Sequence, residues 1–305
     1  MKAVNPAPKK FNCRVKKAII PVAGLGTRFL PLSKVLPKEL FPLVDKPILQ
    51  YIVEEAVASG IDEIIFVSRE GKELILDYFT KDNGPIKKIL KERKKDKILK
   101  ELKNFEKISE NVSLSQYTVS QVFQKEPLGD GHAILQAKEE IKDERVAILF
   151  GDDVVESKTP CLLQLIKGFE KYHRPIVALS QIPKERLPFY GVVRVEKLKD
   201  RVYKIKEIIE KPSIEKAPSN LAIVGKYILT PEVFKYLAKS KPTQKGEIIL
   251  AESLEGMIKD DKSVLGYEFE GKWLECGNKE DWLKSNFYLT LKHPQFGPVL
   301  KKYLK

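Results

Sequence analysis

The sequence has few of the features on which several protein classes depend. Its three cysteines, Cys13, Cys161 and Cys276, lie far apart without the spacing of metal ligands, which argues against a disulfide framework and a zinc site. No segment approaches the roughly 18 consecutive apolar residues of a membrane span. Residues 1–17 lack the apolar core of a signal peptide. We therefore expect a cytoplasmic protein without a membrane partner.

The usual arrangements for nucleophilic catalysis are missing as well. The chain has three histidines, and none of them forms a Ser-His-Asp or Cys-His pattern. Low-complexity linkers and internal repeats are also absent. A hydrophobic content of 43% beside 32% charged residues is instead typical of a folded globular chain, and 305 residues are enough for one large α/β domain or two smaller ones.

Acidic residues are outnumbered, which gives the chain a formal net charge of +13. Much of the surplus lies in residues 87–107, where Leu99, Leu102 and Phe105 recur at helical spacing. These lysines are explained most simply as the solvated face of an amphipathic helix. A nucleic-acid-binding surface would add base-stacking aromatics and a steep salt dependence. We expect no nucleic-acid partner, but a positive field that attracts phosphorylated ligands.

The most informative stretch is Ala18–Pro47, AIIPVAGLGTRFLPLSKVLPKELFPLVDKP. It opens with an apolar run that predicts a buried strand, followed by a turn with two glycines, a hydroxyl and a cation. Glycines let backbone N–H groups approach an anion closely, and cations match phosphate oxygens. The stretch is neither a Walker A loop nor the dinucleotide fingerprint, because it lacks Gly-Lys-Ser/Thr and a third glycine that opens a helix. It predicts a polyphosphate site formed by Ala23, Gly24, Gly26, Thr27, Arg28 and Lys38.

Strands alternate with helices along the chain. The expected strands are 18–22, 63–68, 112–123, 146–150, 176–181, 191–197, 202–210, 221–229 and 264–269, and no neighbour can be named for the last. The expected helices are 48–59, 72–79, 129–138, 231–238, 247–258 and 280–290. This pattern predicts an α/β protein with a Rossmann-like, mixed, mostly parallel central sheet flanked by helices. Ligands in such sheets bind beyond the carboxyl ends of the strands, where the glycine turn would lie.

Two further loops follow expected strands. Gln124 offers an amide donor and acceptor suited to the imide edge of a uracil, and Gly129 would let a base lie against the backbone, although such a loop can also be an ordinary surface turn. His132 is interpreted as a structural residue at a helix start. Asp152 follows the strand at 146–150, where it could cap a helix or hold Mg²⁺, which takes one or two carboxylates plus substrate phosphates.

The amino-acid sequence of these stretches resembles the signature of the sugar-1-phosphate nucleotidyltransferases. The similarity rests on Gly24–Pro31, on Pro37–Pro47 and on Trp273–Lys279, and it extends from about residue 16 to 297. Within this family it is most similar to the bacterial UTP–glucose-1-phosphate uridylyltransferases, because it includes the helical insert that relatives making dTDP-glucose lack. The resemblance implies a nucleotide-diphospho-sugar transferase fold and transfer of a uridylyl group from UTP to glucose 1-phosphate, which gives UDP-glucose and pyrophosphate.

The resemblance also implies roles for the cations and the base-binding loop. Arg28 would bind the departing pyrophosphate, Lys38 the transition state and Lys211 the sugar phosphate. Gln124 and Gly129 would contact the base. Because the sugar phosphate is already an anionic nucleophile, the reaction needs alignment and charge neutralisation and no general base.

Sugar and metal ligands follow from the same resemblance. Gly191, Glu210 and Ile223 would line the sugar pocket together with the cation at 211. Asp152 and Glu275 would hold Mg²⁺. The family normally has Asp at the second of these positions, so Glu275 would reach the ion either directly or through water.

The expected organisation is one nucleotidyltransferase domain at 16–297, between a flexible arm at 1–15 and a tail at 298–305. Nucleotide binding would lie mainly in 16–160 and sugar binding mainly in 175–280. Members of the family usually form homo-oligomers, so a dimer or tetramer is expected.

Two other functions are compatible with the same residues. One is a glucose-1-phosphate thymidylyltransferase, which an assay of UTP against dTTP would distinguish. The other is a non-catalytic UDP-sugar-binding paralogue, which only Glu275 favours. Pyrophosphate release from UTP, Mg²⁺ and glucose 1-phosphate would separate an enzyme from a binding protein.

Overall fold

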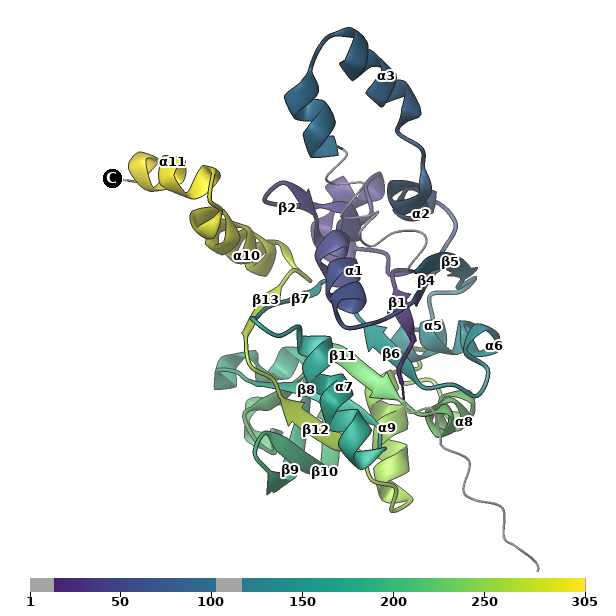
Figure 1. The fold of residues 1–305 in the computed structure, drawn as a ribbon. Helices are drawn as coiled ribbons and strands as arrows, with labels where there is room; N and C mark the ends of the chain where they lie inside the picture. The colour runs from purple at the N-terminus through teal and green to yellow at the C-terminus, as the bar shows by residue number, and fades with distance from the viewer. Residues whose placement is uncertain (1–13, 103–116, 305) are drawn as a thin grey trace, which may run out of the picture.

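A computed structural model describes residues 14–102 and 117–304. The strands of its central sheet are β1 (Lys17–Pro21), β4 (Glu63–Ser68), β5 (Thr118–Phe123), β6 (Val146–Leu149), β8 (Ile176–Gln181), β9 (Gly191–Lys199), β10 (Val202–Glu210), β11 (Leu221–Leu229) and β12 (Leu265–Glu268). They form one nine-stranded sheet in the order β5-β4-β1-β6-β11-β8-β12-β10-β9 (Figure 1).

The main helices are α1 (Ile48–Ala58), α2 (Glu73–Thr80), α3 (Gly84–Glu92), α5 (Asp130–Gln136), α6 (Lys138–Ile141), α7 (Cys161–Tyr172), α8 (Pro231–Lys239), α9 (Leu250–Lys259), α10 (Lys279–Lys292) and α11 (Phe296–Tyr303). Two small sheets pair β2 (Pro42–Leu43) with β3 (Lys46–Pro47), and β7 (Asp153–Glu156) with β13 (Lys272–Glu275). Within the described ranges, no helix is both long enough and apolar enough to cross a lipid bilayer.

The sheet changes character along its width. β5, β4, β1 and β6 are parallel neighbours, whereas β11 runs antiparallel to both β6 and β8. The strand expected at 264–269 without a named neighbour is β12, which pairs in parallel with β8 and antiparallel with β10. The α/β fold class with a mixed sheet is therefore confirmed. The contiguous parallel strands come from the first half of the chain, and the second half adds the parallel pair β8–β12 among antiparallel neighbours, so the sheet is less parallel than expected.

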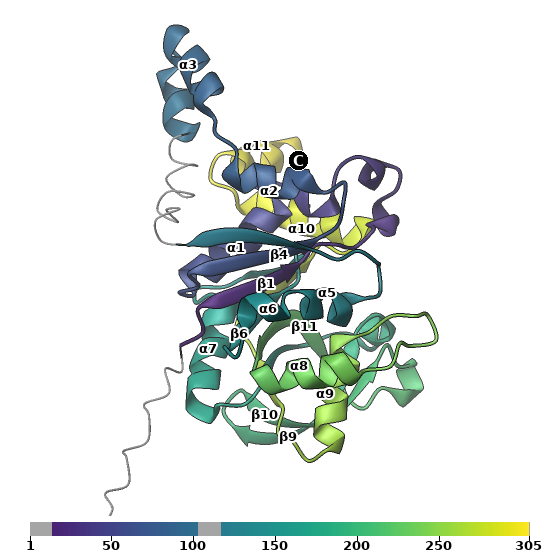
Figure 2. The same cartoon turned by 90° about the vertical axis from the view of Figure 1, so that its right-hand side faces the viewer.

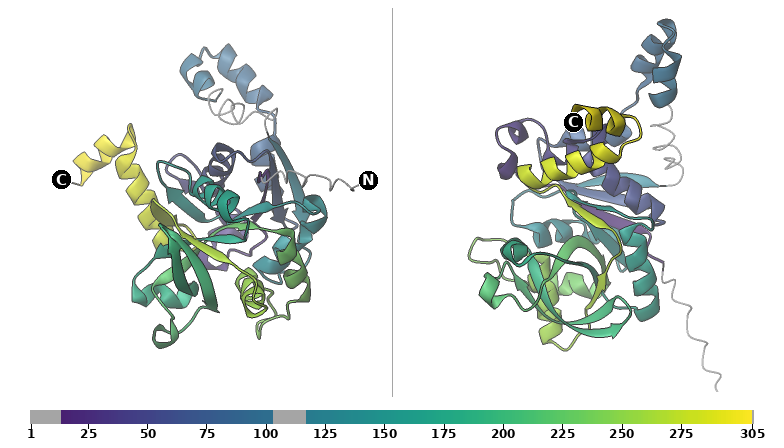
Figure 3. Two further views of the ribbon diagram at one scale, coloured as in Figure 1. Left: turned by 60° about the horizontal axis from the view of Figure 1, so that its bottom comes forward. Right: turned by 90° about the vertical axis from the view of Figure 1, so that its left-hand side faces the viewer.

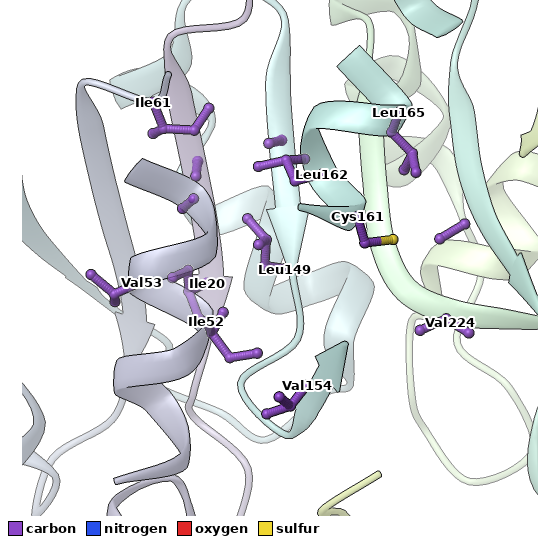
Figure 4. Packing of buried hydrophobic residues seen from close by; sticks show 14 of the residues in the cluster. Ile20, Ile52, Val53, Ile61, Leu149, Val154, Cys161, Leu162, Leu165 and Val224 are labelled. Carbon is purple, nitrogen blue, oxygen red and sulfur yellow. The ribbon is translucent and has the colours of Figure 1, made fainter. Parts of the chain in front are cut away.

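Hydrophobic side chains alternate between the two faces of the sheet, and each face has its own core. Ile20 of β1 packs into the cluster beneath α1 and α7, together with Ile52 and Leu162 (Figure 4). Ile19 points to the opposite cluster, which the helices α5, α8 and α9 cover. Figure 2 shows α1 and α5 on opposite sides of the strands β1 and β4. This two-faced burial fixes the register of β1, and so fixes where the loop after it begins.

The basic segment differs from the expected single helix. α3 ends at Glu92, and Lys94 has a positive φ of 51°, which breaks the helix before a second helical stretch over residues 96–102. α3 lies away from the sheet in every view (Figures 1–3). Leu99 is buried there, while Phe105 and the first residues of the strand expected at 112–123 lie outside the described ranges.

Several elements are present that the sequence pattern did not assign. Helix α7 follows β7 in the sequence, precedes β8 and covers the sheet. The β7–β13 pair joins residues more than a hundred positions apart. Helix α11 occupies most of the segment expected as a tail. Of the expected arm, only residues 14 and 15 are described, and Val15 is already buried in the core.

Candidate active site

The loop after β1 is shaped by one glycine with a left-handed backbone. Gly26 has φ +67°, and its carbonyl accepts a hydrogen bond from Ser33 Oγ at 2.7 Å. A Cβ at this position would lie 3.1 Å from the Ser33 Cβ. Any other residue would therefore strain the backbone and press on Ser33. The resulting turn starts the short 3-10 helix Thr27–Phe29, which carries Arg28.

Beneath this loop lies a buried ion pair that joins three segments. Lys72 Nζ is 3.0 Å from Glu39 Oε2 and donates a hydrogen bond to the Val22 carbonyl at 2.5 Å. The side chains of Lys72 and Glu39 are only 5% and 2% exposed. Burial lowers the pKa of Lys72, and the Glu39 carboxylate partly offsets this effect. The pair ties the start of the glycine loop to the residue that follows Lys38.

Lys38 and Asp152 form the central ion pair of the site. Lys38 Nζ is 2.5 Å from Asp152 Oδ2, and both side chains are one-fifth exposed. Burial opposes the charge on each group, but the partner outweighs it: the pKa of Lys38 is raised by Asp152, and the pKa of Asp152 is lowered by Lys38 and Arg28. Both groups are therefore charged at neutral pH. The segment after Asp152 is strand β7, so a helix-capping role for this residue is wrong.

Glu275 is held from one side by groups that the sequence analysis did not select. Its Oε2 accepts hydrogen bonds from Arg186 and from the Tyr190 hydroxyl. Arg186 also contacts Asp281 at 2.9 Å. Burial raises the pKa of Glu275. The other oxygen, Oε1, faces Gly277, whose carbonyl lies 3.5 Å from an Arg28 guanidinium nitrogen.

The loop after β5 forms backbone hydrogen bonds with Ile248, in the segment before α9. Gln124 is buried, and its Nε2 lies 3.0 Å from the Gly129 carbonyl. Gly129 has φ +94°, and a Cβ there would lie 2.5 Å from the Ile248 carbonyl, so only glycine fits. Asp130 Oδ1 accepts the Leu250 N–H at 2.9 Å, and burial raises the pKa of Asp130 to about 6.

The opposite wall of the site comes from β9, β10 and β11. Gly191 pairs with Glu210 across β9 and β10, and a Cβ on the glycine would lie 3.1 Å from Glu210 Oε2. Lys211 follows with a positive φ of 48°, and its Nζ lies 3.1 Å from Glu210 Oε1. Ile223 of β11 lies within 3.5 Å of the same glycine position.

Three adjoining cavities are bordered by the residues selected from the sequence. The first, the glycine-loop cavity, is bordered by Ala23, Gly24, Gly26, Thr27, Lys38, Gln124, Gly129 and Asp152. The second, the middle cavity, is bordered by Gly26, Thr27, Arg28, Lys38, Gly129, Asp130, Glu210 and Lys211. The third, the β11 cavity, is bordered by Arg28, Asp152, Gly191, Glu210, Lys211, Ile223 and Glu275. The structure thus brings every site residue selected from the sequence into one continuous cleft.

Several residues of this cleft were missed by the sequence analysis. Asp130 borders all three cavities, and Asp153 accepts the Gly225 N–H at 3.1 Å and the Trp273 indole N–H at 2.7 Å, which fixes β7 and β13 against β11. Burial raises the pKa of Asp153 to about 7. The position of Asp153 directly after Asp152, at the end of an expected strand, was a sequence signal for it. Nothing in the local sequence pointed to Arg186.

Two carboxylates of the cleft have the chemistry of Mg²⁺ ligands. Among the described residues, no three His, Cys, Asp or Glu side chains gather into a ready-made metal site. However, Asp152 Oδ2 and Glu275 Oε1 lie 3.2 and 3.4 Å from the point where a Cβ on Gly277 would stand. Two carboxylate oxygens therefore face one small space beside Gly277, and the Asp152 oxygen is the one that pairs with Lys38. This donor set fits Mg²⁺, which takes its remaining ligands from water and substrate phosphates.

A sequence model of the family described as "Nucleotidyl transferase" matches residues 17–290. The chain belongs to this nucleotidyl transferase family. A UTP–glucose-1-phosphate uridylyltransferase from Staphylococcus haemolyticus is 40% identical over 292 residues, which cover 96% of this nucleotidyl transferase and 98% of the relative.

Two solved structures resemble the nucleotidyl transferase over most of its length. A UDP-glucose pyrophosphorylase complexed with UDP-glucose has a TM-score of 0.81 and 36% identity, and the match covers 92% of this chain and all of the other. A UTP-bound UGPase from Acinetobacter baumannii has a TM-score of 0.83 and 33% identity, with coverage of 95% and 99%. The family and fold expected from the sequence are both confirmed.

Proposed function

We propose that this protein transfers a uridylyl group from UTP to glucose 1-phosphate, which gives UDP-glucose and pyrophosphate. The observation that carries the proposal is the convergence of Arg28, Lys38 and Lys211 on the middle cavity, between a glycine loop and a carboxylate-bearing wall. Relatives with the corresponding name or with bound UTP and UDP-glucose support the choice of substrates.

The reaction requires two polyanions to meet in line. An oxygen of the sugar phosphate attacks the α-phosphorus of UTP, and the bond between the α-phosphorus and the β-phosphate oxygen breaks as pyrophosphate leaves. Lys211 holds the attacking phosphate, Lys38 neutralises charge at the α-phosphate, and Arg28 binds the departing pyrophosphate. The catalytic contribution comes from alignment and from fixed positive charge in a partly desolvated cleft.

The two ends of the cleft hold the two ends of the product. The base lies in the glycine-loop cavity against Ala23, Gly24 and Gly129, with the Gln124 amide at its polar edge. The sugar lies in the β11 cavity, where Glu210 accepts hydrogen bonds from its hydroxyls and the Gly191 backbone and the Ile223 side chain limit its shape.

Mg²⁺ is the metal that we propose for this site, held by Asp152 and Glu275. It supplies positive charge that screens the phosphate oxygens. Arg186 and Tyr190 occupy one oxygen of Glu275 and turn the other toward Asp152. This arrangement supports direct coordination by the longer glutamate side chain, because its position is fixed from behind.

The test of the proposed function is a pyrophosphate-release assay with purified protein. UTP, dTTP, CTP and ATP are each offered with several sugar 1-phosphates and with Mg²⁺. We expect the highest kcat/KM for UTP with glucose 1-phosphate. Higher kcat/KM with dTTP would assign the protein to thymidylyl transfer, and no release with any pair would leave a binding protein.

A homo-oligomer, dimer or tetramer, is the assembly that we propose. Support comes from exposed apolar side chains on the two C-terminal helices, namely Leu283, Phe287, Phe296, Val299, Tyr303 and Leu304. Figure 3 shows these helices projecting beyond the sheet. Light scattering coupled to size-exclusion chromatography checks the assembly, and a monomer at micromolar concentration would contradict it.

A further inference from the structure

The side chain of Gln124 is held by two neighbours on the same side. It is 5% exposed, and its Nε2 lies 3.0 Å from the Gly129 carbonyl oxygen and 2.9 Å from His132 Nδ1. The other end of the imidazole, His132 Nε2, lies 3.1 Å from the amide nitrogen Nε2 of Gln136, one turn further along α5. The base-facing amide is thus the first member of a short polar chain.

The Gly129 carbonyl determines which atoms donate and which accept in this series of hydrogen bonds. A carbonyl oxygen only accepts hydrogen bonds, so the amide nitrogen of Gln124, not its oxygen, must face Gly129. The second N–H of that nitrogen then points at His132 Nδ1, which must accept. A neutral imidazole has one N–H, so the proton is on Nε2.

The orientation of the Gln136 amide can adjust to the tautomer that Gln124 imposes on His132. Gln136 has a competing contact, since its Nε2 is also 3.3 Å from the His132 carbonyl. Gln136 is half-buried, however, and can exchange the two ends of its amide or turn toward water. Gln124 is buried with two shorter contacts, so it determines the tautomer of His132.

Both N–H groups of Gln124 are therefore engaged, and only its oxygen is available to a ligand. Among the described residues, no group donates a hydrogen bond to Gln124 Oε1, and Gln124 borders the glycine-loop cavity. An acceptor at this place matches the N3–H of a uracil or thymine imide. In the same pose, cytosine presents the lone pair of an unprotonated N3, which an acceptor repels.

We propose that His132 is a specificity-determining residue, which fixes Gln124 as a hydrogen-bond acceptor so that the base subsite selects imide-bearing nucleoside triphosphates against cytidine triphosphate. The proposal rests on the proposed function, because it places the base beside Gln124. His132 touches no substrate. Without its acceptor nitrogen, one N–H of Gln124 stays on the Gly129 carbonyl and the second N–H is released, so that the amide can present a donor to cytosine N3.

The experiment compares two substitutions at His132 that differ in one property. In His132→Leu, a methyl group replaces the acceptor Nδ1, whereas in His132→Asn the side-chain oxygen can accept in its place. kcat/KM is measured with UTP, CTP and dTTP at saturating glucose 1-phosphate. Gln136→Met serves as a control on the same helix, because Gln124 alone determines the tautomer.

For His132→Leu we expect kcat/KM to fall with UTP and to rise with CTP, so that the UTP/CTP ratio decreases about ten- to a hundredfold. The UTP/dTTP ratio should stay unchanged, because both bases present the same N3–H. His132→Asn and Gln136→Met should keep the wild-type UTP/CTP ratio. The change should be in KM more than in kcat, since the base is remote from the reacting phosphorus.

Three results separate the possible failures. If wild-type protein does not turn over UTP, the proposed function itself is wrong. If it prefers UTP but His132→Leu keeps the wild-type UTP/CTP ratio in folded protein, the specificity role of His132 is overturned. Equal losses with UTP, CTP and dTTP, in either His132 variant, would likewise show a structural role only. A melting curve of each variant establishes that the protein is folded.

Discussion

Lys38 is the cation of the cleft that forms an ion pair with Asp152. It pairs with Asp152 and borders both the glycine-loop and the middle cavities. If it neutralises charge at the α-phosphate, Lys38→Ala should lower kcat by about three powers of ten. Lys34→Ala, an exposed lysine nearby that borders none of the three cavities, should be close to wild type.

Near-wild-type turnover of Lys38→Ala would refute this role. The far-ultraviolet circular dichroism of the variant should remain that of the wild type, because Lys38 belongs to neither of the two large hydrophobic clusters. The pyrophosphate assay and the spectrum together separate a catalytic loss from unfolding.

The raised pKa of Asp130 predicts that the stability of the protein depends on pH. Burial raises its pKa from 3.8 to about 6, so the folded protein binds this proton more tightly than the unfolded chain. The contribution to stability is therefore fully present below pH 3.8 and is lost as the pH rises through about 6. In Asp130→Asn this loss is absent, and the asparagine oxygen can still accept the Leu250 N–H.

The difference in unfolding free energy between wild type and Asp130→Asn should therefore change with pH in favour of the variant. We expect a change of about 2 kcal/mol between pH 4 and pH 7, which is reduced from the full linkage value because the side chain keeps some exposure to water. Urea unfolding at several pH values measures it. A pH-independent difference would contradict the assigned shift.

At the scale of elements, the buried pair of Lys72 and Glu39 holds three loops together. Lys72→Met leaves Glu39 buried without a partner, which should cost about 3 kcal/mol of stability. It should also lower kcat about ten- to a hundredfold, because Lys38 and the glycine loop lose their common support. Glu39→Gln in the same chain should restore part of the stability but not the kcat.

Lys226 and Glu55 provide a matched control for this prediction. Their side chains are 0% and 9% exposed, with 2.9 Å between Nζ and Oε2, but they join β11 to α1 and not the loops of the site. Lys226→Met should lose similar stability and much less kcat. Equal losses of kcat in Lys226→Met and Lys72→Met would show that any buried defect damages the enzyme, and no special support of Lys38 would remain.

Elements with a strong local pattern were predictable from the sequence. The strands at 63–68, 176–181, 202–210 and 221–229 have the predicted bounds, because β-branched and aliphatic residues recur in each of them between turn signals. Helix α7 was missed although Leu162, Leu165 and Phe169 recur on one face. Its first turn follows Pro160 and has no side-chain cap, so the usual start signal is absent.

Pairings between distant segments were not predictable. β7 and β13 have four residues each and meet across more than a hundred positions, so no local pattern marks them. Arg186 was missed for the same reason, because its partner Glu275 comes from another part of the chain. The cations and glycines of the cleft were found because their types and spacing follow from phosphate chemistry and resemble a family signature.

The charge of the whole molecule predicts a kinetic effect. A net charge of +13 should draw UTP and glucose 1-phosphate toward the cleft at low ionic strength. Raising the salt from about 50 mM to about 500 mM should lower kcat/KM several-fold and leave kcat nearly unchanged, because screening acts on the encounter. Replacing Lys91, Lys94 and Lys95 by glutamine should weaken this dependence without touching the site.

The measurement is stopped-flow or steady-state turnover over a salt series, with an inert salt that does not bind Mg²⁺. A kcat that falls with salt in parallel with kcat/KM would contradict electrostatic attraction as the cause. It would point to screening within the cleft itself.

The central claim is that one cleft aligns a nucleotide and a sugar phosphate between the glycine loop and the β9–β11 wall. A crystal structure of the protein with UDP-glucose tests it most directly. We predict the base over Gly24 and Gly26, the diphosphate between Arg28 and Lys211, and the sugar against Glu210. A product bound elsewhere, or a diphosphate that Lys211 and Asp152 do not face, would contradict the account.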